Sequence, residues 1–70
     1  MAMTNAELLA MIRDHATKTA DPDQNGWDHI SEFLSDQDIL HELEEGNCTT
    51  WDQALAHFER IAKDWHDYNR

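Results

Sequence analysis

The segment Trp51–Tyr68 reads WDQALAHFERIAKDWHDY and decides the fold, because apolar residues recur along it at helical spacing. They follow an i, i+3, i+4, i+7 pattern for five turns, at Trp51, Ala54, Leu55, Phe58, Ile61, Ala62, Trp65 and Tyr68. This stripe predicts a long amphipathic helix that buries one face, with Thr49 or Thr50 as its N-cap. Phe58 and Ile61 lie in the middle of the stripe, so we expect both side chains in the core.

The N-terminal segment predicts a second long helix, from Asn5 to about Thr19. Thr4 and Glu7 have the spacing of a capping box, in which each side chain bonds the other residue's backbone N–H. Apolar residues then recur on one face, at Leu8, Leu9, Met11, Ile12 and Ala16. The helix is expected to end before Pro22, because a proline disfavours helical backbone at the residue before it.

Two short helices are expected between these long ones. The first starts near Trp27 and the second runs from Asp36 to Glu45, after an N-cap at Ser35 and before a C-cap at Gly46. Their apolar residues again have helical spacing: Trp27, Ile30, Phe33, Leu34, then Ile39, Leu40 and Leu43. Since no segment alternates with period two, the sequence predicts an all-α protein. The expected architecture is one domain over residues 1–70, a compact bundle of three to four short helices.

Size and composition narrow the function. A chain of 70 residues, 40% of them hydrophobic, can build one modest core but hardly the deep pocket of a conventional enzyme. No Ser-His-Asp or Cys-His arrangement and no glycine-rich phosphate loop is recognisable, so the sequence predicts a protein that is not an enzyme. A lone cysteine, Cys48, favours a reducing cytoplasmic setting and a role as a small apolar filler. No apolar run approaches the roughly 20 residues of a membrane span.

Charge is the strongest compositional signal. The formal net charge is −10, which disfavours direct binding to nucleic acid or to an anionic membrane. The five Lys and Arg residues all lie in the two terminal helices. Between Lys18 and Arg60 only acidic residues carry a formal charge, at Asp21, Asp23, Asp28, Glu32, Asp36, Asp38, Glu42, Glu44, Glu45, Asp52 and Glu59. The middle of the chain is therefore expected to form an anionic surface without nearby cations.

Helical spacing groups these acids further. Asp38, Glu42 and Glu45 share one face of the third expected helix, and Asp28 and Glu32 share a face of the second. Successive i, i+4 acids lie about 6 Å apart along a helix axis, and one DNA strand places a phosphate every ~3.4 Å, so two such rows could imitate a phosphate ladder. The candidate partner-binding residues are Asp28, Glu32, Asp36, Asp38, Glu42, Glu44 and Glu45. The alternative is a solvated face that only keeps the protein soluble.

The segment from Asp21 to Glu32 also fits the spacing of an EF-hand calcium loop. In this alternative Asp21, Asp23, Asn25 and Glu32 would supply oxygen ligands for Ca²⁺, and Gly26 would allow the sharp turn. Against it, Asp28 occupies the loop position that is normally apolar, and no second loop is present to pair with this one. Turn and capping preferences alone also predict a connection of this composition between two helices.

In size, charge and helicity the whole chain resembles small phage and mobile-element proteins that neutralise host defence nucleases, such as anti-CRISPR proteins and other DNA mimics. That resemblance implies a basic nucleic-acid-binding partner, such as a CRISPR effector or another nuclease, and a location in the host cytoplasm. The segments Gly26–Glu32 and Ser35–Ile39 are also similar to short prophage-type proteins of unknown function. A phage accessory protein whose charge serves only solubility therefore stays open as an alternative.

Overall fold

The computed structural model describes residues 2–20 and 26–68, and this part of the chain is an all-α bundle. Its helices are α1 (Asn5–Thr19), α2 (Trp27–Phe33), α3 (Asp36–Glu45) and α4 (Trp51–Tyr68). No strand occurs within the described ranges. The expected fold class is therefore confirmed.

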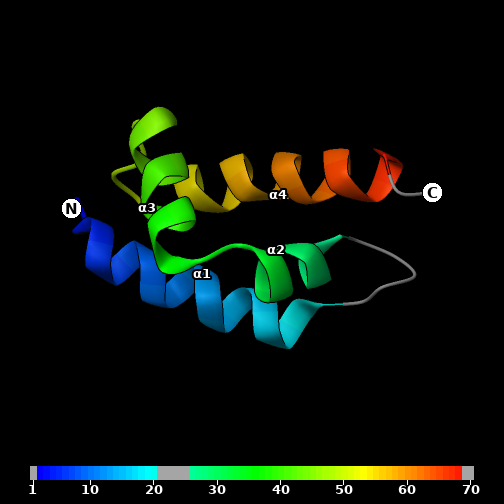
Figure 1. Ribbon diagram of the computed structural model, residues 1–70. Helices are drawn as coiled ribbons and strands as arrows, with labels where there is room; N and C mark the ends of the chain where they lie inside the picture. The colour runs from blue at the N-terminus through cyan, green and yellow to red at the C-terminus, as the bar shows by residue number, and fades with distance from the viewer. Residues whose placement is uncertain (1, 21–25, 69–70) are drawn as a thin grey trace.

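The two long helices form the walls of the bundle. In Figure 1, α1 and α4 run in the same direction, α2 lies between their C-terminal halves, and α3 crosses them near their N-terminal ends. The segment before α1 is tied to the connection before α4, because the Met3 backbone N–H donates to the Thr49 carbonyl oxygen at 2.7 Å. The third helix, α3, lies at one end of the bundle (Figure 1), and the face that holds its buried residues packs against α1.

Side-chain caps mark where α1, α3 and α4 begin, whereas α2 follows Gly26 without a side-chain cap. The expected capping box at α1 is present, since the Glu7 N–H donates to Thr4 Oγ1 and the Thr4 N–H donates to the Glu7 carboxylate. A second capping box starts α3, where Ser35 and Asp38 exchange the same two bonds. At α4 the Gln53 N–H donates to Thr50 Oγ1 at 3.3 Å, which identifies Thr50 as the N-cap.

The core contains residues from every helix, and the largest side chain that it buries completely is Phe58. The fully or nearly buried apolar residues are Leu8, Ile12, Ala16, Trp27, Ile30, Ile39, Leu43, Cys48, Ala54, Phe58 and Ala62. Ile61 packs against this core but is only half-buried, less than expected.

Three aromatic side chains of the predicted apolar stripes are not buried. Phe33 is 62% exposed, Trp65 38% and Tyr68 89%. The reason lies in helix length: Phe33 is the last residue of α2, and the end of α4 extends beyond the end of α1 (Figure 1). These apolar side chains therefore stay exposed, because the neighbouring helices do not extend far enough to cover them.

Gly26 allows the start of α2 to pack directly against the backbone of α4. Its φ is 75°, in the left-handed region, and a Cβ built at this position would lie 2.0 Å from the carbonyl oxygen of Ala62. No residue with a side chain fits so close to a neighbouring backbone. The contact sets the distance at which Trp27 and Ile30, just inside α2, reach the core.

Candidate functional site

The predicted acidic surface is carried mainly by α3. Ile39 and Leu43 bury one side of this helix, and the opposite side is exposed at Gln37, Asp38, His41, Glu44 and Glu45. Asp36 is also exposed, whereas Glu42 is half-buried at the border of the face. Of the seven candidate partner-binding residues, five therefore gather on one short helix at the end of the bundle.

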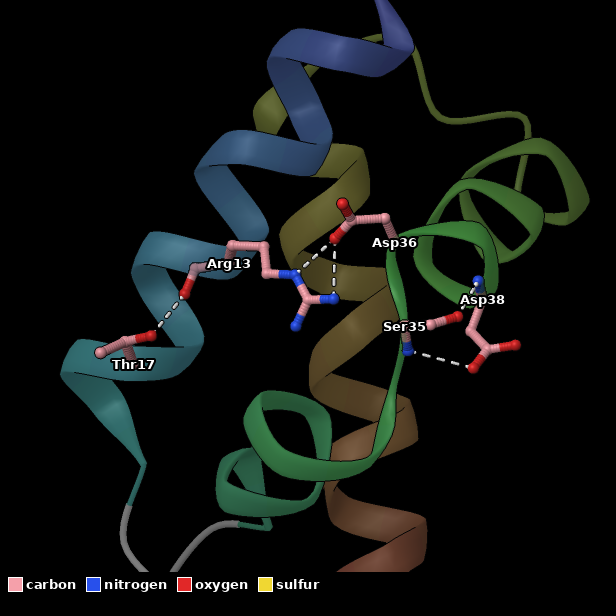
Figure 2. A network of polar contacts seen from close by, with 5 residues as sticks. All are labelled: Arg13, Thr17, Ser35, Asp36 and Asp38. Atoms are coloured by element: carbon pink, nitrogen blue, oxygen red, sulfur yellow. Dashed lines mark hydrogen bonds and ion pairs between the residues drawn. The ribbon is translucent and has the colours of Figure 1, made fainter.

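One cation from outside the acidic segment reaches this surface. In Figure 2 the Arg13 guanidinium extends from α1 to Asp36 at the start of α3, with Nη2 at 2.8 Å and Nε at 2.9 Å from the same carboxylate oxygen. The expectation of an anionic surface without nearby cations was wrong here, because packing of α1 against α3 joins residues 23 positions apart. Asp36 is still two-thirds exposed, so the pair adds at most about 1 kcal/mol to stability.

Histidines contact three of the other candidate acids. His57 Nε2 of α4 lies 3.0 Å from Glu42 Oε1, and His41 Nε2 lies 3.5 Å from Glu45 Oε1. In α2 the His29 ring approaches Asp28, with 3.9 Å between Nε2 and Oδ2. Such a contact is an ion pair only when the histidine is protonated, so a neutral histidine leaves the negative charge of its carboxylate uncompensated.

Asp38 is exposed and also caps the start of α3. One carboxylate oxygen accepts the Ser35 N–H in the α3 capping box, as Figure 2 also shows. This bond holds the side chain in one orientation at the start of the helix. An acid here also interacts favourably with the positive end of the helix dipole.

On α2 the two candidate acids are presented unequally. Glu32 is exposed, but the Asp28 side chain is only 18% exposed, and its Oδ1 is buried with no hydrogen-bond partner in the described part of the chain. Since α2 packs against both α1 and α4, its outward face is narrow and Asp28 lies at the edge of that face. The expected exposed row of Asp28 and Glu32 is therefore reduced to Glu32.

Sequence reasoning missed an aromatic cluster beside Glu32, which we define as His29, Phe33 and Trp65. The His29 ring lies 5.7 Å from Phe33 and 5.1 Å from Trp65 between centroids, and the Phe33 and Trp65 rings are nearly parallel at 6.3 Å. Periodicity assigned Phe33 and Trp65 to the core. Their position in the sequence could have indicated exposure, because both residues lie near the C-terminal ends of their helices.

A shallow depression of about 320 Å³ lies between α1 and the start of α4. Its lining consists of Ala10, Met11, Asp14, His15, Lys18 and Trp51. The two charged residues of the lining neutralise each other, since Lys18 Nζ lies 3.0 Å from Asp14 Oδ2. The remaining lining is apolar apart from His15, whose ring meets Trp51 edge-on.

The calcium alternative falls mostly outside the described residues, since Asp21, Asp23 and Asn25 belong to the undescribed range and only Glu32 is placed, exposed on α2. Within residues 2–20 and 26–68, no three His, Cys, Asp or Glu side chains come together as a metal site would require. Cys48 is buried as expected, and burial raises the pKa of its thiol.

A search against protein-family models, curated proteins and solved structures finds nothing that matches this chain. In the described part of the chain, every helix is too short or too polar to pass through a lipid bilayer.

Proposed function

We propose that this protein binds a basic nucleic-acid-binding protein and masks or inhibits it, with the exposed acids of α3 as the main contact. The partner expected is a CRISPR effector or another nuclease whose Lys- and Arg-lined groove normally holds nucleic acid. The protein would act by stoichiometric binding in the host cytoplasm, without catalysis or a cofactor, as an anti-CRISPR or DNA-mimic protein does.

The observation that carries the proposal is the concentration of carboxylates on α3. Residues 26–50 hold seven acids and no Lys or Arg. Among the described residues, the ion pair between this segment and a Lys or Arg elsewhere in the chain is Arg13–Asp36. A surface of one sign attracts a basic groove over a distance and selects against acidic partners. Glu44 adds exposed charge on α3, and Glu32 is exposed on α2.

The way α3 is held also favours binding. Ile39 and Leu43 anchor the helix in the core, and the Ser35–Asp38 capping box fixes its first turn. A helix held in this way loses little conformational entropy when a partner docks on it. The acids therefore form a preorganised array, in contrast to acids on a loop.

The test compares two variants of equal net charge. The face variant carries Asp38→Asn, Glu42→Gln and Glu45→Gln. The control variant carries Asp52→Asn, Glu59→Gln and Asp64→Asn, at positions exposed on α4. Each is titrated against purified CRISPR effectors and nucleases, with displacement of bound DNA as the readout, at low and at physiological salt.

We expect the face variant to lose more than about tenfold in affinity, or 1.4 kcal/mol, and the control to lose much less. Wild-type binding should weaken steeply with salt, because the Debye length is only about 8 Å at physiological ionic strength. In contrast, Arg13→Gln should leave affinity unchanged or increase it, since it releases Asp36 from its ion pair. Equal binding by the wild type and the face variant at both salt concentrations would refute the proposal.

A further inference from the structure

Two rings of the aromatic cluster of His29, Phe33 and Trp65 are exposed, Phe33 to 62% and Trp65 to 38%. Phe33 and Trp65 together present two nearly parallel ring planes, and His29 contacts both of them. Contiguous exposed apolar patches rimmed by polar residues mark interaction surfaces, whereas single exposed apolar residues do not. The cluster joins α2 to α4, so its shape is set by the packing of two helices.

Carboxylates lie beside these rings. On the seven-residue helix α2, Glu32 and Phe33 follow each other, and Asp28 precedes His29 and lies one turn before Glu32. Glu32 is exposed, and the Oδ1 atom of Asp28 is a buried acceptor without a hydrogen-bond donor in the described part of the chain. The surface therefore combines ring faces with one accessible carboxylate, that of Glu32, because the Asp28 side chain is mostly buried.

We propose that the aromatic cluster, together with Glu32, is a docking site for an arginine side chain of the basic partner. This inference rests on the proposed function and deepens it, because it names the residue type recognised beside the acidic face. A guanidinium is planar and weakly hydrated, so it stacks on aromatic rings and donates hydrogen bonds to carboxylates at the same time. A lysine ammonium is a compact, strongly hydrated charge that fits this surface less well.

Charge complementarity selects this occupant over the alternatives. An apolar segment would cover the rings but would also bury the carboxylate charge of Glu32 without a partner, which is costly. A second copy of this chain would bring another net charge of −10 and the same exposed carboxylate to the contact. An arginine satisfies the rings and Glu32 together, and aromatic residues and arginine are the residues enriched at interface hot spots.

The test uses hexa-arginine and hexa-lysine peptides as probes of equal charge. Binding to the full-length wild type is followed by tryptophan fluorescence and confirmed by calorimetry at low salt. We expect the arginine peptide to bind about threefold to tenfold more tightly than the lysine peptide, the range that one cation–π contact supplies. Phe33→Ala and Trp65→Leu should each reduce that ratio toward one, whereas Tyr68→Ala, a change at the most exposed aromatic residue, should leave the ratio unchanged.

Phe33 is more than half exposed, so the Phe33→Ala protein should stay folded, which circular dichroism checks. Equal affinity of the wild type for the two peptides would overturn the inference, as would an arginine preference that survives Phe33→Ala. A concentration-dependent dimer that Phe33→Ala abolishes would also overturn it, because a second copy would then be the occupant. The α3 face variant tests the proposed function separately, since it should weaken both peptides while keeping their ratio.

Discussion

Replacement of Gly26 by alanine should strongly destabilise the fold, although the change adds only one methyl group. The new Cβ would lie 2.0 Å from the Ala62 carbonyl oxygen and 2.8 Å from the carbonyl carbon. Both atoms belong to the backbone of α4, so no side-chain rotation can relieve the contact. The N-terminus of α2 would have to move away from α4 by more than 1 Å to reach ordinary van der Waals separation, since 3.4 Å is where ordinary contact begins.

Two costs add up. A residue with a side chain loses about 1–2 kcal/mol in the left-handed region. Forcing an extra methyl group into a packed position costs typically about 1–3 kcal/mol more. A domain of this length has a total stability of roughly 4–10 kcal/mol at 0.05–0.15 kcal/mol per residue. The sum of about 2–5 kcal/mol should lower the melting temperature by about 10 °C or more, at 4–8 °C per kcal/mol for a chain of this size.

The assay is thermal and urea unfolding followed by circular dichroism, with Gly46→Ala as the matched control. Gly46 has an ordinary φ of −84°, and a Cβ there would lie 2.9 Å from His57 Nδ1 and 3.1 Å from Cys48 Sγ, which are side-chain atoms and not backbone. Gly26→Asn separates the two costs, because asparagine tolerates the left-handed region but still carries a Cβ.

We expect Gly46→Ala to cost less than Gly26→Ala, since its backbone conformation suits alanine and its close neighbours are side-chain atoms rather than backbone atoms. Gly26→Asn should be nearly as destabilised as Gly26→Ala. A Gly26→Ala protein that melts within about 3 °C of the wild type, less than 1 kcal/mol at this size, would refute the close contact between α2 and α4.

Other predictions concern the core, pH and metal. Phe58→Ala should cost about 3–5 kcal/mol and leave a largely unfolded protein, seen as lost helical signal and urea cooperativity; full wild-type cooperativity would mean that this ring faces a partner instead. Hydrogen bonds from Thr4 hold the pKa of Glu7 below its ordinary value of 4.5. The stabilisation from Glu7 is thus present above that value and lost as pH falls through the lowered pKa, so wild-type melting temperature should fall more steeply there than that of Glu7→Gln. Millimolar Ca²⁺ should raise the melting temperature no more than Mg²⁺ does, whereas a filled site would add about 2.7 kcal/mol at a hundred times Kd; a calcium-specific rise that Glu32→Gln removes would contradict this.

Local signals in the sequence were sufficient to predict the helices. The Thr4–Glu7 and Ser35–Asp38 capping boxes act over three residues, and the structure contains both, with α1 and α3 at the expected bounds. Apolar periodicity likewise predicted α4 over its full length. These signals are readable because each depends on residues within one turn of one another.

Contacts between helices were not predictable in the same way. The Arg13–Asp36 and His57–Glu42 pairs join helices whose relative placement depends on the packing of the whole core. The prediction of burial at helix ends fails for the same reason. Periodicity places Phe33 and Trp65 on an apolar face but does not say how far a neighbouring helix extends over them. The candidate site was therefore predicted as a set of acids on α3, while its internal partners and the aromatic cluster were not.

The contacts within the acidic surface bear directly on how it should be tested. Asp36 pairs through one carboxylate oxygen with Arg13, and Asp38 uses one oxygen in the α3 capping box. Both side chains stay exposed, so the same residue can stabilise the fold and face a partner. Alanine at position 38 would remove a helix-capping interaction worth about 1 kcal/mol and confuse lost folding with lost binding. Asparagine keeps an acceptor for the Ser35 N–H and removes only the charge, so a binding defect in Asp38→Asn reports on the charge alone.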